Sequence, residues 1–170
     1  MQLVRLSPAE AEARVDELAA LLADAVSGGA SVTFGASLTP ETARAYWLAQ
    51  AKAGDGRAMI AAIDGEGVCG FVQVIPVPMA NQPHRAEISK LLVHRRARRQ
   101  GLGEKLMREA EAAARDMGRP HLMLDTAKGD DAERLYARLG WNRVGEIPGF
   151  AFDPAGALRT TVFFWKQAQE

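Results

Sequence analysis

Residues 87–103, EISKLLVHRRARRQGLG, join an apolar segment to an arginine-rich loop and then to two glycines that open a helical pattern. The apolar segment predicts a buried strand, and apolar positions recur at helical spacing after Gly101. A helix N-terminus has unpaired backbone N–H groups and about half a positive charge, and glycine lets a ligand approach the backbone closely. We therefore predict that this junction binds a phosphate-sized anion, with Arg98, Arg99 and Gln100 as further donors.

The six residues at this junction, 98–103 or RRQGLG, resemble the (Gln/Arg)-x-x-Gly-x-(Gly/Ala) signature of the GCN5-related N-acetyltransferases (GNAT family). The strand before them looks like the fourth strand of that family, and a later short helix carries AERLYARLGW. The resemblance implies acetyl-CoA as cosubstrate, with its pyrophosphate on the loop amides and its pantetheine along the preceding strand. The coenzyme-binding residues it implies are Leu91, Leu92, Val93, Arg98, Arg99, Gln100, Gly101, Leu102, Gly103 and Glu104.

Two carboxylates are candidates for the base that deprotonates the acceptor amine. Asp125 ends the strand expected beside the coenzyme strand, where burial would raise its pKa toward the working range. Glu87 lies on the coenzyme strand, where many family members have an acidic residue that acts through water. Either residue could instead be structural, Glu87 by pairing with a surface arginine and Asp125 by holding the loop that follows it.

Tyr136 is at the position where the family commonly has a tyrosine that protonates the sulfur of coenzyme A. A phenol with a pKa of about 10 is a suitable proton donor to a thiolate with a pKa of about 8.5. The alternative is core packing, because Tyr136 borders an apolar helix face. A backbone N–H near Leu92 or Val93 is expected to donate to the thioester oxygen, since a bulge there would leave it unpaired.

Residues 28–34, 124–141 and 145–166 resemble the tabtoxin-resistance subgroup of the family. In that subgroup the aspartate ending this strand and the tyrosine of this helix are the proposed acid/base pair, which favours Asp125 over Glu87. The chain departs from the family at Gly129, where asparagine is frequent, so that nearby backbone would have to replace a side-chain hydrogen bond to pantetheine.

Phe34, Trp47, Phe150, Phe152 and Asp153 are expected to line the acceptor pocket, because they lie in segments that vary around the coenzyme cleft of this fold. Asp153 would suit a cationic amine. Core packing explains the aromatic residues equally well.

The resemblance implies an α/β (α+β) GNAT fold, with a mixed, mostly antiparallel sheet of six to seven strands and about four helices, and the length predicts one domain over residues 1–170. A strand, a helix and a second strand joined by short connections predict a parallel pair formed by residues 88–93 and 121–126. Strands are expected at 3–6, 57–63, 68–77, 88–93, 121–126, 141–147 and 160–165, and helices at 8–26, from 40 onward, at 102–117 and at 132–139.

Composition excludes several classes of protein. Lys+Arg and Asp+Glu are equal at 21 each, so no net charge attracts nucleic acid or an anionic membrane. Cys69 is the only cysteine, and the three histidines lack metal-ligand spacing, so no metal site is expected. No apolar run approaches the roughly 20 residues of a membrane span, and no signal peptide is evident. A soluble, cytoplasmic protein is expected.

The function indicated is an acetyl-CoA-dependent N-acetyltransferase that acts by direct attack in a ternary complex on a primary amine of a small molecule, such as a toxin or antibiotic-like compound. The alternatives are acetylation of a protein or peptide, and a coenzyme-binding sensor without catalysis. A nucleic-acid-binding role for the arginines of residues 94–99 is disfavoured, because no aromatic residues are interleaved with them. An edge strand at residues 160–165 could pair with a second copy in a homodimer.

Overall fold

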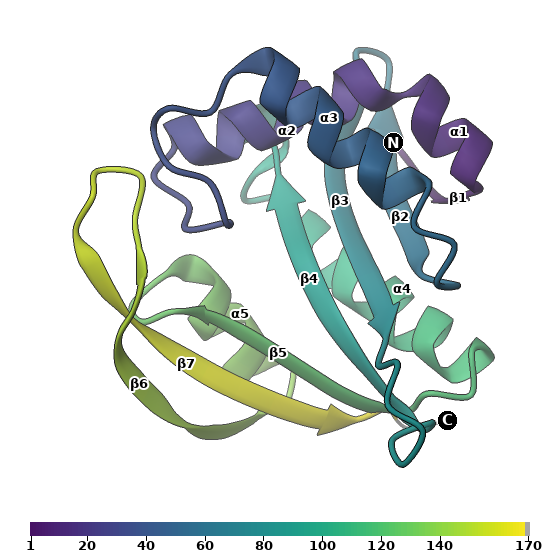
Figure 1. Cartoon of the computed structure of the whole chain (residues 1–170), viewed down its shortest axis with the longest axis vertical. Helices are drawn as coiled ribbons and strands as arrows, with labels where there is room; N and C mark the ends of the chain where they lie inside the picture. Colours follow the sequence, from purple (N-terminus) through teal and green to yellow (C-terminus); the bar gives the residue numbers. More distant parts are fainter. Residues whose placement is uncertain (169–170) are drawn as a thin grey trace.

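The computed structural model describes residues 1–168 and contains one seven-stranded sheet between two layers of helices (Figure 1). The strands are β1 (Gln2–Leu6), β2 (Ala58–Asp64), β3 (Gly67–Pro76), β4 (Arg85–Val93), β5 (His121–Ala127), β6 (Asn142–Phe152) and β7 (Leu158–Gln167). The helices are α1 (Pro8–Ala13), α2 (Val15–Ser27), α3 (Pro40–Ala51), α4 (Leu102–Asp116) and α5 (Asp131–Arg138). The strand order is β1-β2-β3-β4-β5-β7-β6, and only the β4–β5 pair is parallel. The predicted fold class is confirmed.

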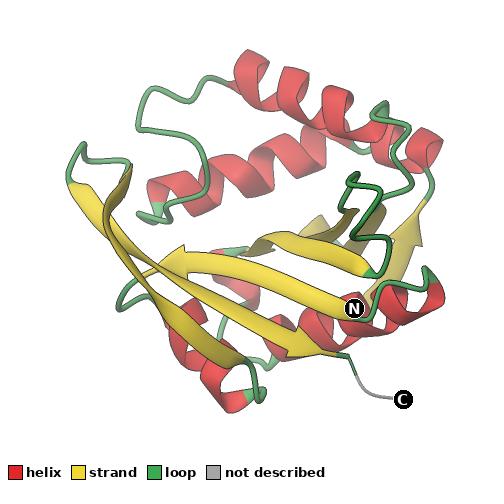
Figure 2. Cartoon of the chain, turned by 60° about the horizontal axis from the view of Figure 1, so that its bottom comes forward, coloured by secondary structure: helices red, strands yellow, loops and turns green. Residues whose placement is uncertain are grey.

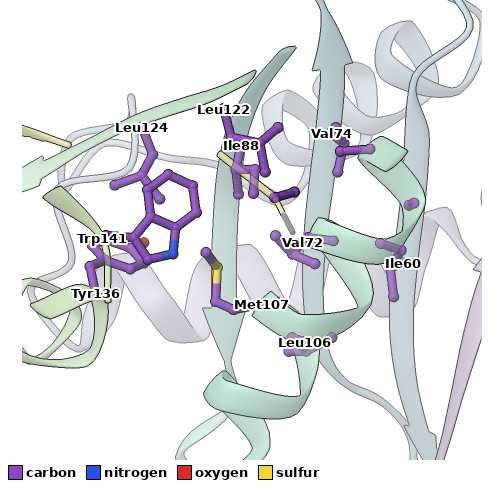
Figure 3. Packing of buried hydrophobic residues seen from close by; sticks show 14 of the residues in the cluster. Ile60, Val72, Val74, Ile88, Leu106, Met107, Leu122, Leu124, Tyr136 and Trp141 are labelled. Atoms are coloured by element: carbon purple, nitrogen blue, oxygen red, sulfur yellow. The ribbon is translucent and has the colours of Figure 1, made fainter. Parts of the chain in front are cut away.

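The two faces of the sheet have separate hydrophobic cores, and Figure 2 shows the sheet between the two helical layers. On one face, Ile60, Val72 and Val74 pack with Leu106 and Met107 of α4 (Figure 3). On the other face, α1, α2 and α3 cover the first strands of the sheet. Alternate residues of each strand therefore point to different helices, as the period of two of a strand requires.

The helix predicted over residues 8–26 is two helices, so residues 1–168 contain five α-helices where about four were expected. The predicted start is confirmed: the Ser7 hydroxyl accepts from the backbone N–H of Glu10, and the Glu10 carboxylate accepts from that of Ser7. The break falls at Arg14, which has φ −105° and ψ 17°. Residues 9–27 contain neither glycine nor proline, so the local sequence gives no signal for this break.

The strand predicted at residues 160–165 is not an edge strand, which corrects the expectation that it pairs with a second copy. β7 pairs with β5 on one side and with β6 on the other. After α5 the chain enters the sheet at its edge as β6, and the hairpin returns β7 into the gap between β6 and β5. Because both sides of β7 are used in the sheet, its backbone offers no free side. The two edge strands are β1 and β6.

Two irregularities in β4 determine the site. The register with β3 pairs Gln73 with Ser89 and Phe71 with Leu92, so two residues of β4, Lys90 and Leu91, lie opposite one residue of β3. This is a β-bulge, and Lys90 has a φ of 56°, in the left-handed region. In addition, β4 and β5 pair only from Arg85–Glu87 with His121–Met123, and then diverge (Figure 1).

No helix among the described residues combines the length and the apolar composition that a membrane span needs.

Candidate active site

A cavity of about 370 Å³ lies where β4 and β5 diverge. Its walls come from the bulged part of β4, the end of β5, α5 with the residue before it, the α2–α3 loop, two residues of β6 and one residue of β7. The lining residues are Ala30, Ser31, Val32, Thr33, Ile88, Ser89, Lys90, Leu91, Asp125, Thr126, Ala127, Asp130, Ala132, Tyr136, Phe150, Ala151 and Thr161. The separation of the two strands thus leaves a space that several predicted site residues share.

The loop between α2 and α3 contacts the β6–β7 hairpin beside this cavity. The Ser31 hydroxyl donates to the carbonyl of Phe152 (3.4 Å), and the backbone N–H of Ala36 donates to the carbonyl of Pro154 (3.3 Å). In Figure 1 these two segments approach each other near the diverging ends of β4 and β5. The cavity is therefore covered on one side by two loops that are about 120 residues apart in sequence.

Asp125 is in the cavity, as expected for a base. Its side chain remains open to solvent there, but the surrounding walls partly desolvate it. This desolvation raises the pKa of the Asp125 carboxyl, the Lys90 ammonium opposes the rise, and the charge of Glu87 adds to it. A carboxylate with a raised pKa in a cavity can accept a proton from an amine that binds beside it.

Glu87 does not line the cavity. It lies in the part of β4 that still pairs with β5, opposite Met123, and its carboxylate accepts from Arg85 at 3.2 Å. This arginine contact is the structural role that the sequence left open for Glu87. The geometry therefore favours Asp125 over Glu87 as the base.

Tyr136 lines the cavity and also belongs to the core. Its ring is 5.8 Å from that of Phe164 in an edge-to-face arrangement, and the residue is 5% exposed. The ring of Trp141, labelled beside Tyr136 in Figure 3, is 6.1 Å away. Burial, together with the negative charge of Asp125, strongly raises the pKa of the phenol. The phenol therefore keeps its proton at physiological pH and can act as a hydrogen-bond donor. The two roles considered for Tyr136 are compatible in this position.

The predicted anion site, at the start of α4, presents backbone N–H groups that no side chain caps. α4 begins at Leu102 with no side chain capping its first N–H groups. Arg99 and Gly101 before it have φ values of 60° and 74°, so the loop turns through two left-handed residues into the helix. A Cβ on Gly103 would lie 3.2 Å from a methyl of Leu135, so this position is tightly packed. Free N–H groups, a helix dipole and glycine together fit a pyrophosphate.

The arginines of the loop differ in their contacts. Arg95 pairs with Asp24, and Arg96 with Asp64, whose pKa this hydrogen bond lowers to about 2. Arg98 donates to the carbonyl of Val93 at 3.1 Å. Arg95 and Arg96 are thus engaged within the protein, which adds to the argument against nucleic-acid binding. Among the described residues, Arg99 makes no side-chain hydrogen bond or ion pair, and it is exposed to solvent in the loop before α4.

Of the five residues predicted for the acceptor pocket, Phe150 lines the cavity and the other four do not. Trp47 is fully buried against Phe71, with ring centroids 4.7 Å apart. It therefore belongs to the core, which corrects the prediction that it lines the pocket. Phe34, in the α2–α3 loop, packs edge-to-face on Tyr46 of α3 as part of the core on that face. The Asp153 carboxylate accepts from the Ala157 N–H and faces Arg159, so it stabilises the β6–β7 turn. Phe152, also considered, is exposed and outside the cavity lining.

A sequence model described as the acetyltransferase (GNAT) family matches residues 24–141, which include the anion site, Asp125 and Tyr136. The chain belongs to the GNAT family of acetyltransferases. The solved structures to which it is similar include a ribosomal-protein-alanine N-acetyltransferase from Brucella melitensis (TM-score 0.81, 23% identity, covering 98% of this chain and 99% of that one). A second is a putative acetyltransferase from Salmonella typhimurium with its cofactor acetyl-CoA (TM-score 0.80, 19% identity, covering 100% of this chain and 95% of that one). A third is a putative phosphinothricin N-acetyltransferase (TM-score 0.78, 20% identity, covering 99% of each chain). At these identities the structures support the fold.

Sequence reasoning missed several polar residues in the cavity of this GNAT acetyltransferase: Thr33, Ser89, Lys90, Asp130 and Thr161. One signal was available, because Lys90 is a charged residue inside the apolar run ISKLLV. Another of these residues is Asp130. It precedes α5 without a side-chain capping bond, and its carboxylate instead lies 3.5 Å from Arg159.

This GNAT chain has Gly129 at a position where asparagine is frequent in the family, and the structure shows the backbone there. Gly129 has a φ of 86°, a conformation that glycine and asparagine adopt more readily than other residues. Its backbone N–H donates to the Glu133 carboxylate at 2.7 Å. That N–H is therefore engaged and does not replace the missing asparagine side chain.

Proposed function

We propose that this protein transfers the acetyl group of acetyl-CoA to a primary amine of a small molecule, by direct attack in a ternary complex. The observation that carries the proposal is the position of Asp125. This carboxylate with a raised pKa lies in the cavity between the diverging ends of β4 and β5. The uncapped start of α4, with its glycines, follows the end of β4 in the chain.

The size of the cavity favours a small acceptor over a protein chain. About 370 Å³ is within the range of small-molecule sites, and the contact between the α2–α3 loop and the β6–β7 hairpin covers one side. The similar structures have names that include both protein and small-molecule acetylation, so the names do not select an acceptor. The resemblance to the tabtoxin-resistance subgroup supports a toxin or antibiotic-like amine.

Each step of the acetyl transfer is assigned to one residue of the chain. Acetyl-CoA, when bound, supplies the acetyl group as a thioester. Asp125 accepts a proton from the acceptor amine, which frees the nitrogen lone pair for attack. The bulge falls at Lys90 and Leu91, just before the predicted position, so we assign to the Leu91 N–H the stabilisation of charge on the thioester oxygen. Tyr136 donates a hydrogen bond to the leaving sulfur.

The coenzyme residues follow from the junction before α4. We assign the pyrophosphate to the backbone N–H groups of Gly101, Leu102 and Gly103, with the side chains of Arg98, Arg99, Gln100 and Glu104 around them. Leu91, Leu92 and Val93 provide for the pantetheine the side of the β4 backbone that no longer pairs with β5. The cytoplasm is the proposed location.

Calorimetric titration with acetyl-CoA, followed by a screen of small primary amines for release of coenzyme A thiol, tests the proposal. We expect a Kd in the micromolar range, or roughly −8 kcal/mol, and thiol release that depends on both the amine and the enzyme. Binding without release for any amine or peptide would favour a coenzyme-binding sensor. Release with peptides alone would favour protein acetylation, and a folded protein without binding would overturn the proposal.

A further inference from the structure

Lys90 is a charged residue at the bulge of an otherwise apolar part of β4, and it lines the cavity. Its backbone has a φ of 56°, which costs energy for a residue other than glycine. The bulge changes the direction of the side chain relative to a regular strand. The ammonium group consequently extends toward the α2–α3 loop, where it donates to the Thr33 hydroxyl at 2.7 Å.

The surroundings of this ammonium leave its charge uncompensated. It lies 5.6 Å from the centre of the Tyr46 ring, and burial lowers its pKa while the charge of Asp125 opposes that change. Among the described residues, no carboxylate oxygen lies within 4.0 Å of it. A partly buried cation without an anionic partner is costly, unless a ligand provides the partner.

Asp125, on the facing strand, is the matching anion. Its carboxylate forms no ion pair among residues 1–168, although it lies close enough to Lys90 for the two charges to affect each other's pKa. The other acid of the cavity, Asp130, is compensated by Arg159. The cavity thus contains one unpaired cation and one unpaired anion, separated by a gap wider than 4.0 Å.

We propose that the acceptor is a zwitterion of the amino acid type, with its carboxylate bound by the Lys90 ammonium and its amine directed to Asp125. Each end of such a molecule supplies the charge that one of these residues lacks, so recognition and deprotonation use different ends. Lys90 is then a specificity-determining residue, and the Thr33 hydroxyl holds its ammonium in place. This inference rests on the proposed function, because Asp125 is the base in both.

Binding measured apart from turnover tests the inference. The standard amino acids and the matching amines that lack the carboxylate, such as phenylalanine and phenethylamine, are titrated calorimetrically into the protein, with and without saturating coenzyme A. We expect at least one amino acid to bind about 10- to 100-fold more tightly than its matching amine, as one charge-assisted hydrogen bond allows. Lys90→Met should lower this ratio to near one. Lys52→Met, which removes an exposed lysine at the C-terminal end of α3, outside the cavity lining, should leave it unchanged.

Three results would overturn the inference: no amino acid binds, the amine binds as tightly as the amino acid, or the ratio survives Lys90→Met. If Lys90 only anchored the loop through Thr33, Lys90→Met would lower the affinity for both ligands equally and leave the ratio intact. Unfolding temperatures of the variants show whether each is folded. Selective binding of amino acids without any acetylation would support the inference and contradict the proposed function, so the two can fail separately.

Discussion

The carboxylate of Asp125 and the phenol of Tyr136 line one cavity, and the charge of Asp125 adds to burial in raising the pKa of Tyr136. The two groups thus have fixed roles at neutral pH. The aspartate is the group that loses its proton and can take one from an amine, whereas the tyrosine retains its proton. With so high a pKa, the phenol acts on a leaving thiolate as a hydrogen-bond donor more than as a source of a fully transferred proton.

Replacement of Tyr136 by phenylalanine tests this role while keeping the ring that packs on Phe164. We expect kcat to fall about 10- to 100-fold, because one hydrogen bond to a charged sulfur is lost. The measurement is steady-state thiol release over the accessible pH range, with the unfolding temperature as control. Unchanged turnover would assign Tyr136 to the core alone.

Replacement of Asp125 by asparagine removes the base and keeps the side-chain volume. We expect kcat/KM to fall about 100- to 10,000-fold. Since the pKa of Asp125 is raised, the activity of the wild-type enzyme should decrease as the pH falls through that raised value, and this limb should be absent from the variant. Glu87→Gln is the matched control, and an equal loss in that variant would return Glu87 to the mechanism.

The same substitution should increase stability at neutral pH. The pKa of Asp125 is higher in the folded than in the unfolded protein, so protonated Asp125 contributes favourably to the stability of the fold. This contribution is lost as the pH rises through the folded pKa. At pH 7 the ionised Asp125 therefore destabilises the fold, and Asp125→Asn relieves this cost. Urea denaturation should give a higher midpoint for the variant at pH 7, and this difference should shrink as the pH falls through the raised folded pKa and vanish below the unfolded pKa of about 4. A lower midpoint at pH 7 would contradict the argument.

Gly103→Glu adds bulk and negative charge at the start of α4, 3.2 Å from Leu135 at its Cβ. We expect acetyl-CoA affinity to fall at least 100-fold, because the carboxylate repels a pyrophosphate on the neighbouring N–H groups. Gly103→Gln has the same size without the charge and should lose clearly less affinity. Equal losses would mean that bulk alone matters, and full binding by both variants would place the pyrophosphate elsewhere.

Lys166 of β7 and Glu111 of α4 form a mostly buried ion pair, with Lys166 Nζ at 2.9 and 3.0 Å from the two carboxylate oxygens. Trp141 donates to the same carboxylate at 3.2 Å. Lys166→Met leaves a buried charge without its main partner, which should cost about 2 to 4 kcal/mol of unfolding free energy in urea titrations. Adding Glu111→Gln should recover part of this loss. A double variant less stable than Lys166→Met would show that the charge is not the cause.

The sequence by itself determined the features that depend on residues close together in the chain. The capping box at Ser7, the glycines and free N–H groups before α4, and the aspartate at the end of β5 all arise from local spacing. A helix terminus or a strand end has the same backbone chemistry wherever it is placed. The parallel pair could be predicted from such local spacing, and the resemblance of the local motifs implied the family and its α+β fold.

Only the tertiary structure decided which segments meet. The insertion of β7 between β5 and β6, the divergence of β4 from β5 and the burial of Trp47 depend on packing between distant segments. The same holds for the cavity, which brings Lys90 and Asp125 together from different strands. A lysine in an apolar strand shows only that something must compensate its charge. Which groups are near enough to do so is determined by long-range contacts that local spacing does not encode.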